Sequence, residues 1–237
     1  MNIQKENAIT EGVIWKQILL FFFPILFGTF FQQLYNAADA LIVGRFVGKE
    51  ALSAVGGGTG TVINLLVGFF VGLASGATVI ISQYYGAKRG EMVSYAVHTA
   101  LAFSLIGGLV MMAGGLLAAP WILQVMDTPA DVLELATLYI RIYFLGMTGN
   151  LVYNVGSGIL RAVGDSRRPL YFLIVSCLTN IVLDILLVVA LQMGVAGAAL
   201  ATILSQLLSA VQVIWVLMRT GDMHRLELRK IGFDRRM

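Results

Sequence analysis

The chain has 237 residues, of which 58% are hydrophobic and only 12% are charged, and its mean hydropathy is +0.85. A soluble domain carries roughly twice that charged fraction, so the composition excludes a soluble globular fold and indicates an integral membrane protein. The net charge of +3 comes from basic residues in short segments between apolar runs, a distribution that argues against binding to nucleic acid.

Six apolar segments are long enough to cross a bilayer, which takes about 20 residues per helix. They should all be helices, because open strand edges are not viable in lipid, and this predicts an all-α fold. The first, second and fourth exceed the minimum length, which predicts tilting, bending or extension beyond the hydrocarbon, and Pro24 should bend the first. The predicted spans are 15–43, 51–85, 93–119, 133–160, 169–191 and 195–218.

The basic residues between the spans predict the orientation. With the N-terminus inside the cell, thirteen of the sixteen Lys and Arg residues are cytoplasmic, and Arg45, Lys49 and Arg141 lie near the outer face. We therefore expect a multi-pass protein of the cell membrane with both termini in the cytoplasm. The predicted parts are an N-terminal cytoplasmic segment (1–14), a six-helix transmembrane unit (15–218) and a basic cytoplasmic tail or the start of a linker (219–237).

Two acidic residues lie inside predicted spans, Asp39 in the first and Asp184 in the fifth. A charge near the bilayer centre costs at least ~2.5–3.5 kcal/mol on insertion scales, so such residues usually face a cavity and handle ions. Helical spacing places each of them on a polar stripe. The two stripes are Gln32, Asn36 and Asp39, and Ser176, Asn180 and Asp184.

The depth of these polar groups, counted with a helical rise of ~1.5 Å per residue, predicts one common layer in the outer half of the membrane. Carboxylate, amide and hydroxyl oxygens suit a proton or a small hard cation such as Na⁺, and transporters commonly hold coupling ions in this way. A purely structural role, in hydrogen bonds between helices, is the alternative. The residues of the predicted layer are Asp39, Tyr139, Asn180, Asp184 and Thr202.

No other cofactor is predicted. The single cysteine, Cys177, excludes an intrachain disulfide, and no group of Cys and His residues has the spacing of a metal site. Two acids on separate helices also occur in intramembrane aspartyl proteases. Asp39 follows NAA and Asp184 follows IVL, which is neither of the settings (YD or GxGD) expected of such a protease. We therefore do not expect an enzyme.

Three motifs resemble the multidrug and toxic compound extrusion (MATE) family: GILRAVGDSRRPLYF after the fourth span, SQYYGAKRG at the end of the second and YNAADALIVGRFVG in the first. The similarity runs from about Trp15 to Met218. It implies one lobe, the N-terminal one, of a two-lobe transporter in which each lobe has six helices. The chain departs from the family pattern at GGGTGTVINL in the second span, where a proline-containing stretch is expected, and it lacks the second lobe.

The resemblance implies a cation-coupled antiporter that exports amphipathic organic compounds, most of them cationic, with Na⁺ or H⁺ as the coupling ion. It implies cation binding by Asp39, Asn180, Asp184 and Thr202, with Tyr139 and Asn154 as nearby polar partners. A flippase of lipid-linked saccharides and a half that does not transport without a partner lobe are the alternatives. The expected partners are drug-like substrates, the lipid bilayer, and a second six-helix lobe or another copy of the chain.

Overall fold

The computed structural model describes residues 14–232, without the side chains of residues 70 and 73. The predicted segment 1–14, apart from its last residue, and the end of the predicted tail, 233–237, lie outside the described residues. The elements in chain order are α1 (Ile14–Phe46), α2 (Lys49–Gly56), α3 (Gly58–Gly86), α4 (Gly90–Val125), α5 (Ala130–Leu145), α6 (Met147–Ala162), α7 (Arg167–Asp184), the π-helix η1 (Ile185–Ala190), α8 (Gly194–Arg219) and the 3₁₀-helix η2 (Leu228–Lys230).

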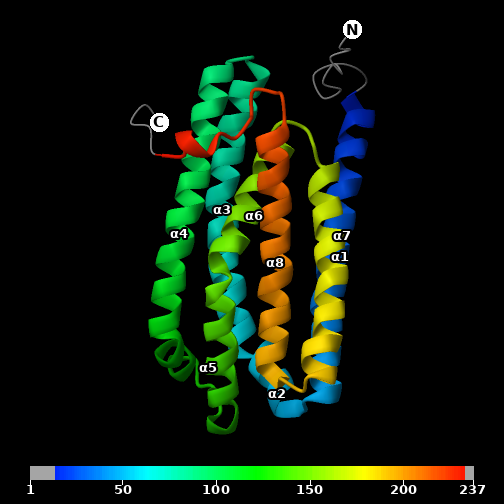
Figure 1. Ribbon diagram of the computed structural model, residues 1–237, viewed down its shortest axis with the longest axis vertical. Helices are drawn as coiled ribbons and strands as arrows, with labels where there is room; N and C mark the ends of the chain where they lie inside the picture. Colours follow the sequence, from blue (N-terminus) through cyan, green and yellow to red (C-terminus); the bar gives the residue numbers. More distant parts are fainter. Residues whose placement is uncertain (1–13, 233–237) are drawn as a thin grey trace.

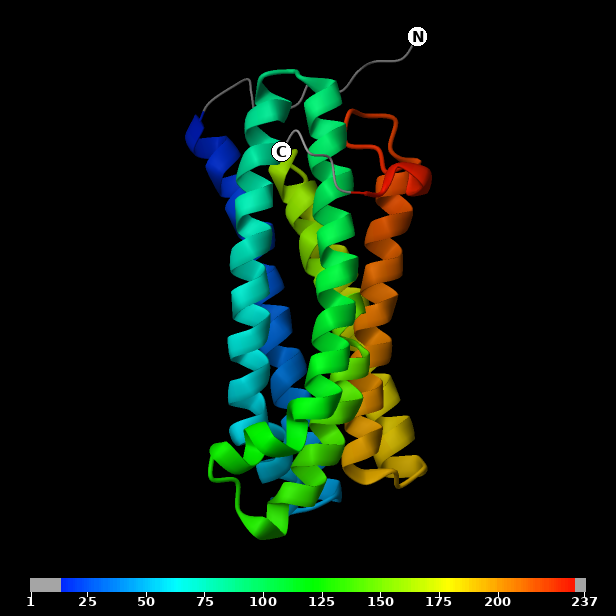
Figure 2. The same ribbon diagram turned by 90° about the vertical axis from the view of Figure 1, so that its left-hand side faces the viewer.

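The long helices lie side by side in one bundle, and α2 lies at the end of the bundle opposite the start of α1 (Figure 1). Within the bundle α6 packs against α3, α4 and α8, while α1 packs against α7, which in turn packs against α8. Figure 2 shows α3 and α4 running next to each other on one side. The start of α1 and η2 lie at the same end of the bundle, as an even number of crossings requires.

Five helices among the described residues are long and apolar enough to cross a membrane, and a bent pair adds a sixth span. These candidates correspond to the six predicted spans, so the predicted all-α membrane bundle is confirmed. The exposed side chains agree with lipid contact, since large apolar residues cover the outside of the bundle, for example Phe30, Leu65 and Trp121.

The predicted fourth span, 133–160, is two helices, because α5 and α6 meet at an angle of 50°. Gly146 stands between them and lies directly against α8, where a Cβ atom would come within 2.5 Å of Ile203 Cγ2. The absence of a side chain therefore lets the bend touch the neighbouring helix. The expectation that this long span bends is confirmed, whereas a single continuous helix is wrong.

The predicted second span is also interrupted, at Gly57 between α2 and α3. A Cβ atom on Gly57 would lie 2.6 Å from the carbonyl oxygen of Ser53, so this close approach of the chain to itself favours glycine. The first span behaves differently, since α1 continues through Pro24 without a break.

The segment after α8 folds back onto the ends of α3 and α4; we call residues 220–232 the docked segment. Leu226, which is 2% exposed, joins the apolar core formed there by α3, α4, α6 and α8. The backbone N–H of Glu227 donates to Nε2 of His98 on α4 over 3.0 Å, and His98 Nδ1 lies 2.6 Å from the carbonyl oxygen of Ser94. Tyr85 at the end of α3 donates to Asp222 over 2.8 Å.

Candidate functional site

The structure brings together four of the predicted site residues, which we call the acidic cluster: Asp39, Asn180, Asp184 and Thr202. Their side chains come from α1, α7 and α8, and each is at most 6% exposed. The carboxylate of Asp39 is close enough to Asp184 to interact with it electrostatically. Tyr139 of α5, which is 4% exposed, interacts with both Asp39 and Thr202. The predicted common layer therefore exists as a set of neighbouring side chains.

The local structure around Asp184 is unusual for a membrane helix. Asp184 is the last residue of α7, and the chain continues as the π-helix η1. In this wider winding a backbone N–H donates to the carbonyl oxygen five residues earlier, as that of Leu191 does to Leu186. π-helical turns within α-helices occur frequently at functional sites, because they shift the side chains that follow relative to those before.

Most polar atoms of the acidic cluster have no hydrogen-bond partner from the protein. Asp39 Oδ1, both carboxylate oxygens of Asp184 and both amide atoms of Asn180 are buried and unpaired. Thr202 is the exception, since its hydroxyl donates to the carbonyl oxygen of Ala198 over 3.0 Å and keeps its lone pairs free to accept. Buried polar groups are nearly always paired in proteins, so this concentration of unpaired oxygen atoms requires an explanation.

The arrangement suits a proton or a small hard cation. Two carboxylates with an amide and a hydroxyl oxygen are the ligand types that Na⁺ takes, and either carboxylate can bind a proton instead. Within residues 14–232 no group of three or more His, Cys, Asp or Glu side chains is placed to hold a metal ion. A cation in the acidic cluster would therefore rely on Asn180 and Thr202 as well as the two acids.

Tyr35 belongs to the same neighbourhood, although it is not one of the residues predicted from the sequence. Its hydroxyl is buried, and the side chain interacts with Thr202, Asp39 and Asp184. Tyr143 completes the aromatic surroundings, because its ring stacks on that of Tyr139 with centroids 6.3 Å apart. Spacing alone could have identified Tyr35, which precedes Asp39 by one helical turn.

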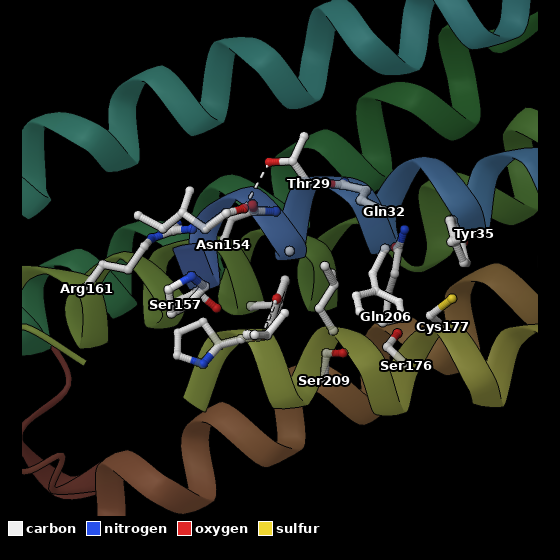
Figure 3. A pocket seen from close by; sticks show the side chains of 18 of the residues that line it. Thr29, Gln32, Tyr35, Asn154, Ser157, Arg161, Ser176, Cys177, Gln206 and Ser209 are labelled. Carbon is white, nitrogen blue, oxygen red and sulfur yellow. Dashed lines mark hydrogen bonds between the residues drawn. The ribbon is translucent and has the colours of Figure 1, made fainter. Parts of the chain in front are cut away.

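A cavity of about 270 Å³ lies between α1, α3, α6, α7 and α8, and it runs from Tyr35, which neighbours the acidic cluster, toward the α6–α7 connection. Figure 3 shows Tyr35 and Cys177 near one end of this cavity and Arg161 at the other. Gln206 also lines it and donates to Tyr143 over 3.5 Å, which links the cavity wall to the aromatic side chains beside the cluster. Further polar lining residues are Thr29, Gln32, Asn150, Asn154, Ser157 and Ser209.

Asn154 lies in this cavity and not in the acidic cluster. Its amide donates to the backbone oxygen and to Oδ1 of Asn150, each over 2.9 Å. The register of α6 against α8 is given by Gly149, which faces Leu207, and by Gly156, which faces Val213. Asn154 is therefore about two and a half helical turns further along the bundle than Thr202.

Two members of the predicted stripes have other roles. Asn36 is exposed on α1 and donates to Gln33 over 3.4 Å, so it does not accompany Asp39 into the bundle. Ser176 is buried and donates to the backbone oxygen of Ser205 over 2.9 Å, which joins α7 to α8. The acidic cluster thus contains Asp39 from the first stripe and Asn180 and Asp184 from the second.

Comparison with known proteins gives consistent matches. The chain matches the MatE family over residues 24–186. It is 33% identical to the probable multidrug resistance protein YoeA of Bacillus subtilis over 86% of this chain and 46% of that protein. It is 23% identical to the multidrug export protein MepA of Staphylococcus aureus over 92% of this chain and 48% of that protein. The chain spans about half the length of these relatives.

Solved structures agree with this assignment. The chain superimposes with a TM-score of 0.88 and 30% identity on a MOP superfamily transporter from Pyrococcus furiosus, covering 100% of this chain and 52% of that one. An outward-facing multidrug resistance MATE transporter gives the same TM-score, identity and coverage. An inward-facing MATE structure gives a TM-score of 0.79 at 32% identity over 86% of this chain and 46% of that one.

Proposed function

This chain belongs to the MATE family, and we propose that it forms the N-terminal, ion-binding half of a cation-coupled antiporter that exports amphipathic organic compounds. The names of its relatives support export of drugs, since YoeA and MepA are both named for multidrug resistance or export. The chain is not an enzyme, as its membership in a transporter family indicates.

One observation carries the proposal: two interacting carboxylates, Asp39 and Asp184, and the amide of Asn180 are buried inside a membrane bundle, and most of their polar atoms are unpaired. Such groups are too costly to be kept for packing alone, because each could be replaced by an apolar residue. Binding of a cation from outside the protein offsets this cost, and the cost returns when the cation is released. The acidic cluster can therefore alternate between two states of different energy.

The coupling step is proposed to act through Tyr35. Na⁺ or H⁺ bound between Asp39 and Asp184 neutralises the charge that faces Tyr35, and the helices α1, α7 and α8 can then pack more closely. Because Tyr35 also lines the cavity, a change of packing there changes the space that a substrate occupies. Binding of the ion and binding of the substrate in this way exclude each other, so that an ion bound from outside favours release of the substrate, as antiport requires.

The proposed orientation places α2 and the acidic cluster toward the outside and the docked segment in the cytoplasm. The excess of basic residues at the docked end supports this choice. The proposed location is the cell membrane, with the start of α1 and the docked segment on the cytoplasmic side.

A second lobe is part of the proposal. The chain covers less than half the length of YoeA and MepA, and family structures contain about twice as much chain. A separate six-helix chain or a second copy of this one would supply the missing surface. Cross-linking between two differently tagged copies would show whether the chain pairs with itself.

The ion site is tested by equilibrium binding of ²²Na⁺ to the purified protein, together with transport in vesicles that carry separate Na⁺ and pH gradients. We expect Asp39→Asn and Asp184→Asn each to lower ion binding or ion-driven export at least ~10-fold, the value of one hydrogen bond to a charged group. Asp131→Asn is the matched control, because Asp131 is exposed on α5. Unchanged binding and export in both cluster variants would refute the coupling role.

A further inference from the structure

Arg161 is a charged residue of the LRAVGD motif with no part in the proposed ion site. It lies at the end of α6, is partly buried, and lines the cavity. Figure 3 shows it at the end of the cavity opposite Tyr35. A guanidinium group cannot lose its charge in a protein, so its presence in an internal cavity requires a compensating partner.

The nearest acid of the motif is already occupied. Asp165 Oδ2 lies 3.2 Å from Nε of Arg168, and its other oxygen accepts the backbone N–H of Arg168 over 3.1 Å. In the described part of the chain, no carboxylate oxygen lies within 4.0 Å of the Arg161 guanidinium. Asp165 therefore pairs with Arg168 near the surface, and Arg161 faces the cavity without a carboxylate partner.

The acidic cluster cannot neutralise Arg161 either. In the register of α6 against α8, Arg161 is level with a position sixteen residues beyond Thr202, a separation of about 24 Å along the axis. Tyr153 is the titratable group that interacts with Arg161, and its hydroxyl donates to the carbonyl oxygen of Pro169 over 3.4 Å. The cavity therefore has a cationic end and, beyond Tyr35, an acidic one.

We propose that Arg161 is a specificity determinant that binds an oxyanion, a carboxylate or a phosphate, on an amphipathic ligand whose apolar body occupies the cavity. A planar guanidinium holds such groups with two parallel hydrogen bonds. Pro24, Leu170 and Leu173 supply apolar wall, and the unpaired hydroxyl of Ser157 supplies a further donor near Arg161. This inference rests on the proposed function, because it names a substrate class for the same cavity, and it adds acidic amphiphiles to the cationic ones.

The test measures binding of 4-butylbenzoate and of its uncharged analogue 4-butylbenzamide to the purified protein in neutral-lipid nanodiscs. We expect the native chain to prefer the benzoate at least ~10-fold, as a bidentate charged pair predicts. Arg161→Gln should abolish this preference, and Arg161→Lys should keep part of it. Arg168→Gln is the matched control, since its side chain is half exposed and does not line the cavity.

The source of the oxyanion is distinguished by a second arm in which part of the neutral lipid is replaced by phosphatidylglycerol. Displacement of the benzoate that requires Arg161 supports the site and assigns the lipid phosphate as its ligand. Absence of displacement supports the site and assigns the free carboxylate. A native chain without preference for benzoate, or an unchanged preference in Arg161→Gln, overturns the proposal.

The same measurements separate this inference from the proposed function. Binding of benzoate needs neither an ion gradient nor a second lobe, so a preference that depends on Arg161 can hold even where ion-driven export fails. Arg161→Lys and the comparison of the two ligands on the native chain remain decisive if Arg161→Gln does not fold. The reverse result, ion-driven export without benzoate preference, removes only the role of Arg161.

Discussion

The acidic cluster and the contact between α4 and the docked segment are both buried and polar, yet they satisfy their hydrogen bonds in opposite ways. In the cluster, both oxygens of Asp184 and both amide atoms of Asn180 are unpaired. At the contact, both ring nitrogens of His98 are engaged, one with Ser94 and the other with the backbone of Glu227. The first arrangement costs stability that a bound ion can recover, whereas the second contributes stability without any ligand.

This difference predicts which substitutions harm the fold and which harm the function. A paired group cannot be removed without leaving its partner unsatisfied, so its loss should lower the free energy of unfolding. An unpaired group has no protein partner to lose, so its loss should affect the ligand and spare the fold. The four predictions below test that distinction, in order of decreasing effect.

The largest effect on stability is expected for His98→Ala. It removes two hydrogen bonds and leaves a hole beside Leu226, so it should lower the free energy of unfolding by about 2–4 kcal/mol. Chemical unfolding in detergent measures this change. Thr99→Val is the matched control, because the neighbouring Thr99 hydroxyl is buried and unpaired and its removal should cost little. A similar loss of stability in both variants would contradict the proposed difference between paired and unpaired buried groups.

Asp184→Asn should have the opposite sign. Replacing a buried unpaired acid with a neutral amide should raise the free energy of unfolding by about 1 kcal/mol at pH 8, while ion binding falls. The measurement is unfolding of both proteins with and without Na⁺. A clear loss of stability in the variant without Na⁺ would show that Asp184 has a structural partner, contrary to the comparison.

The sequence predicted the acidic cluster because its strongest signal is one-dimensional. An acid within a long apolar run, such as Asp39 or Asp184, is conspicuous without any knowledge of neighbours. Helical spacing then gave Asn180, and counting depth gave Thr202 and Tyr139. The family resemblance also supplied Asn154, which the structure places in the cavity, because similarity of motifs does not fix how far apart two side chains lie.

The contact of the docked segment could not be predicted, since it joins residues that are 129 positions apart, His98 and Glu227. A histidine within an apolar helix carries no sign of its partner in the local sequence. The position of the bend in the fourth span, at Gly146, was missed for a related reason. A glycine inside a span is equally compatible with close packing of a straight helix, and only the contact with Ile203 of α8 decides between them.

Acidification should loosen the docked segment. Burial lowers the pKa of His224, and the nearby Arg168 lowers it further, against the opposing effect of Asp222 and Asp165. The folded state therefore binds a proton more weakly than the unfolded one, so the contribution of His224 is complete above about pH 6.5 and is lost as the pH falls below it.

Hydrogen exchange at the backbone amides of Leu226 and Glu227 measures this loosening directly. After correction for the intrinsic rates, protection should fall between pH 7.5 and pH 5.5, by at most ~10-fold per pH unit for each proton bound. His224→Gln should reduce the pH dependence, and His98→Ala should remove protection at both pH values. Protection that is independent of pH in the native chain would show that protonation of His224 is not coupled to docking.

The smallest effect is expected for Lys230→Gln. The Lys230 ammonium lies 3.0 Å from the Glu227 carboxylate, and this contact lowers the pKa of that carboxyl, but both side chains are about half exposed. Water and salt screen such pairs, so the substitution should leave the free energy of unfolding unchanged within error. Glu227 thus carries two contacts of different kinds, a backbone N–H bonded to buried His98 and a carboxylate paired on the surface. If Lys230→Gln releases the docked segment as His98→Ala does, surface charge and not the buried hydrogen bond holds it, and raising the salt concentration should then release it in the native chain as well.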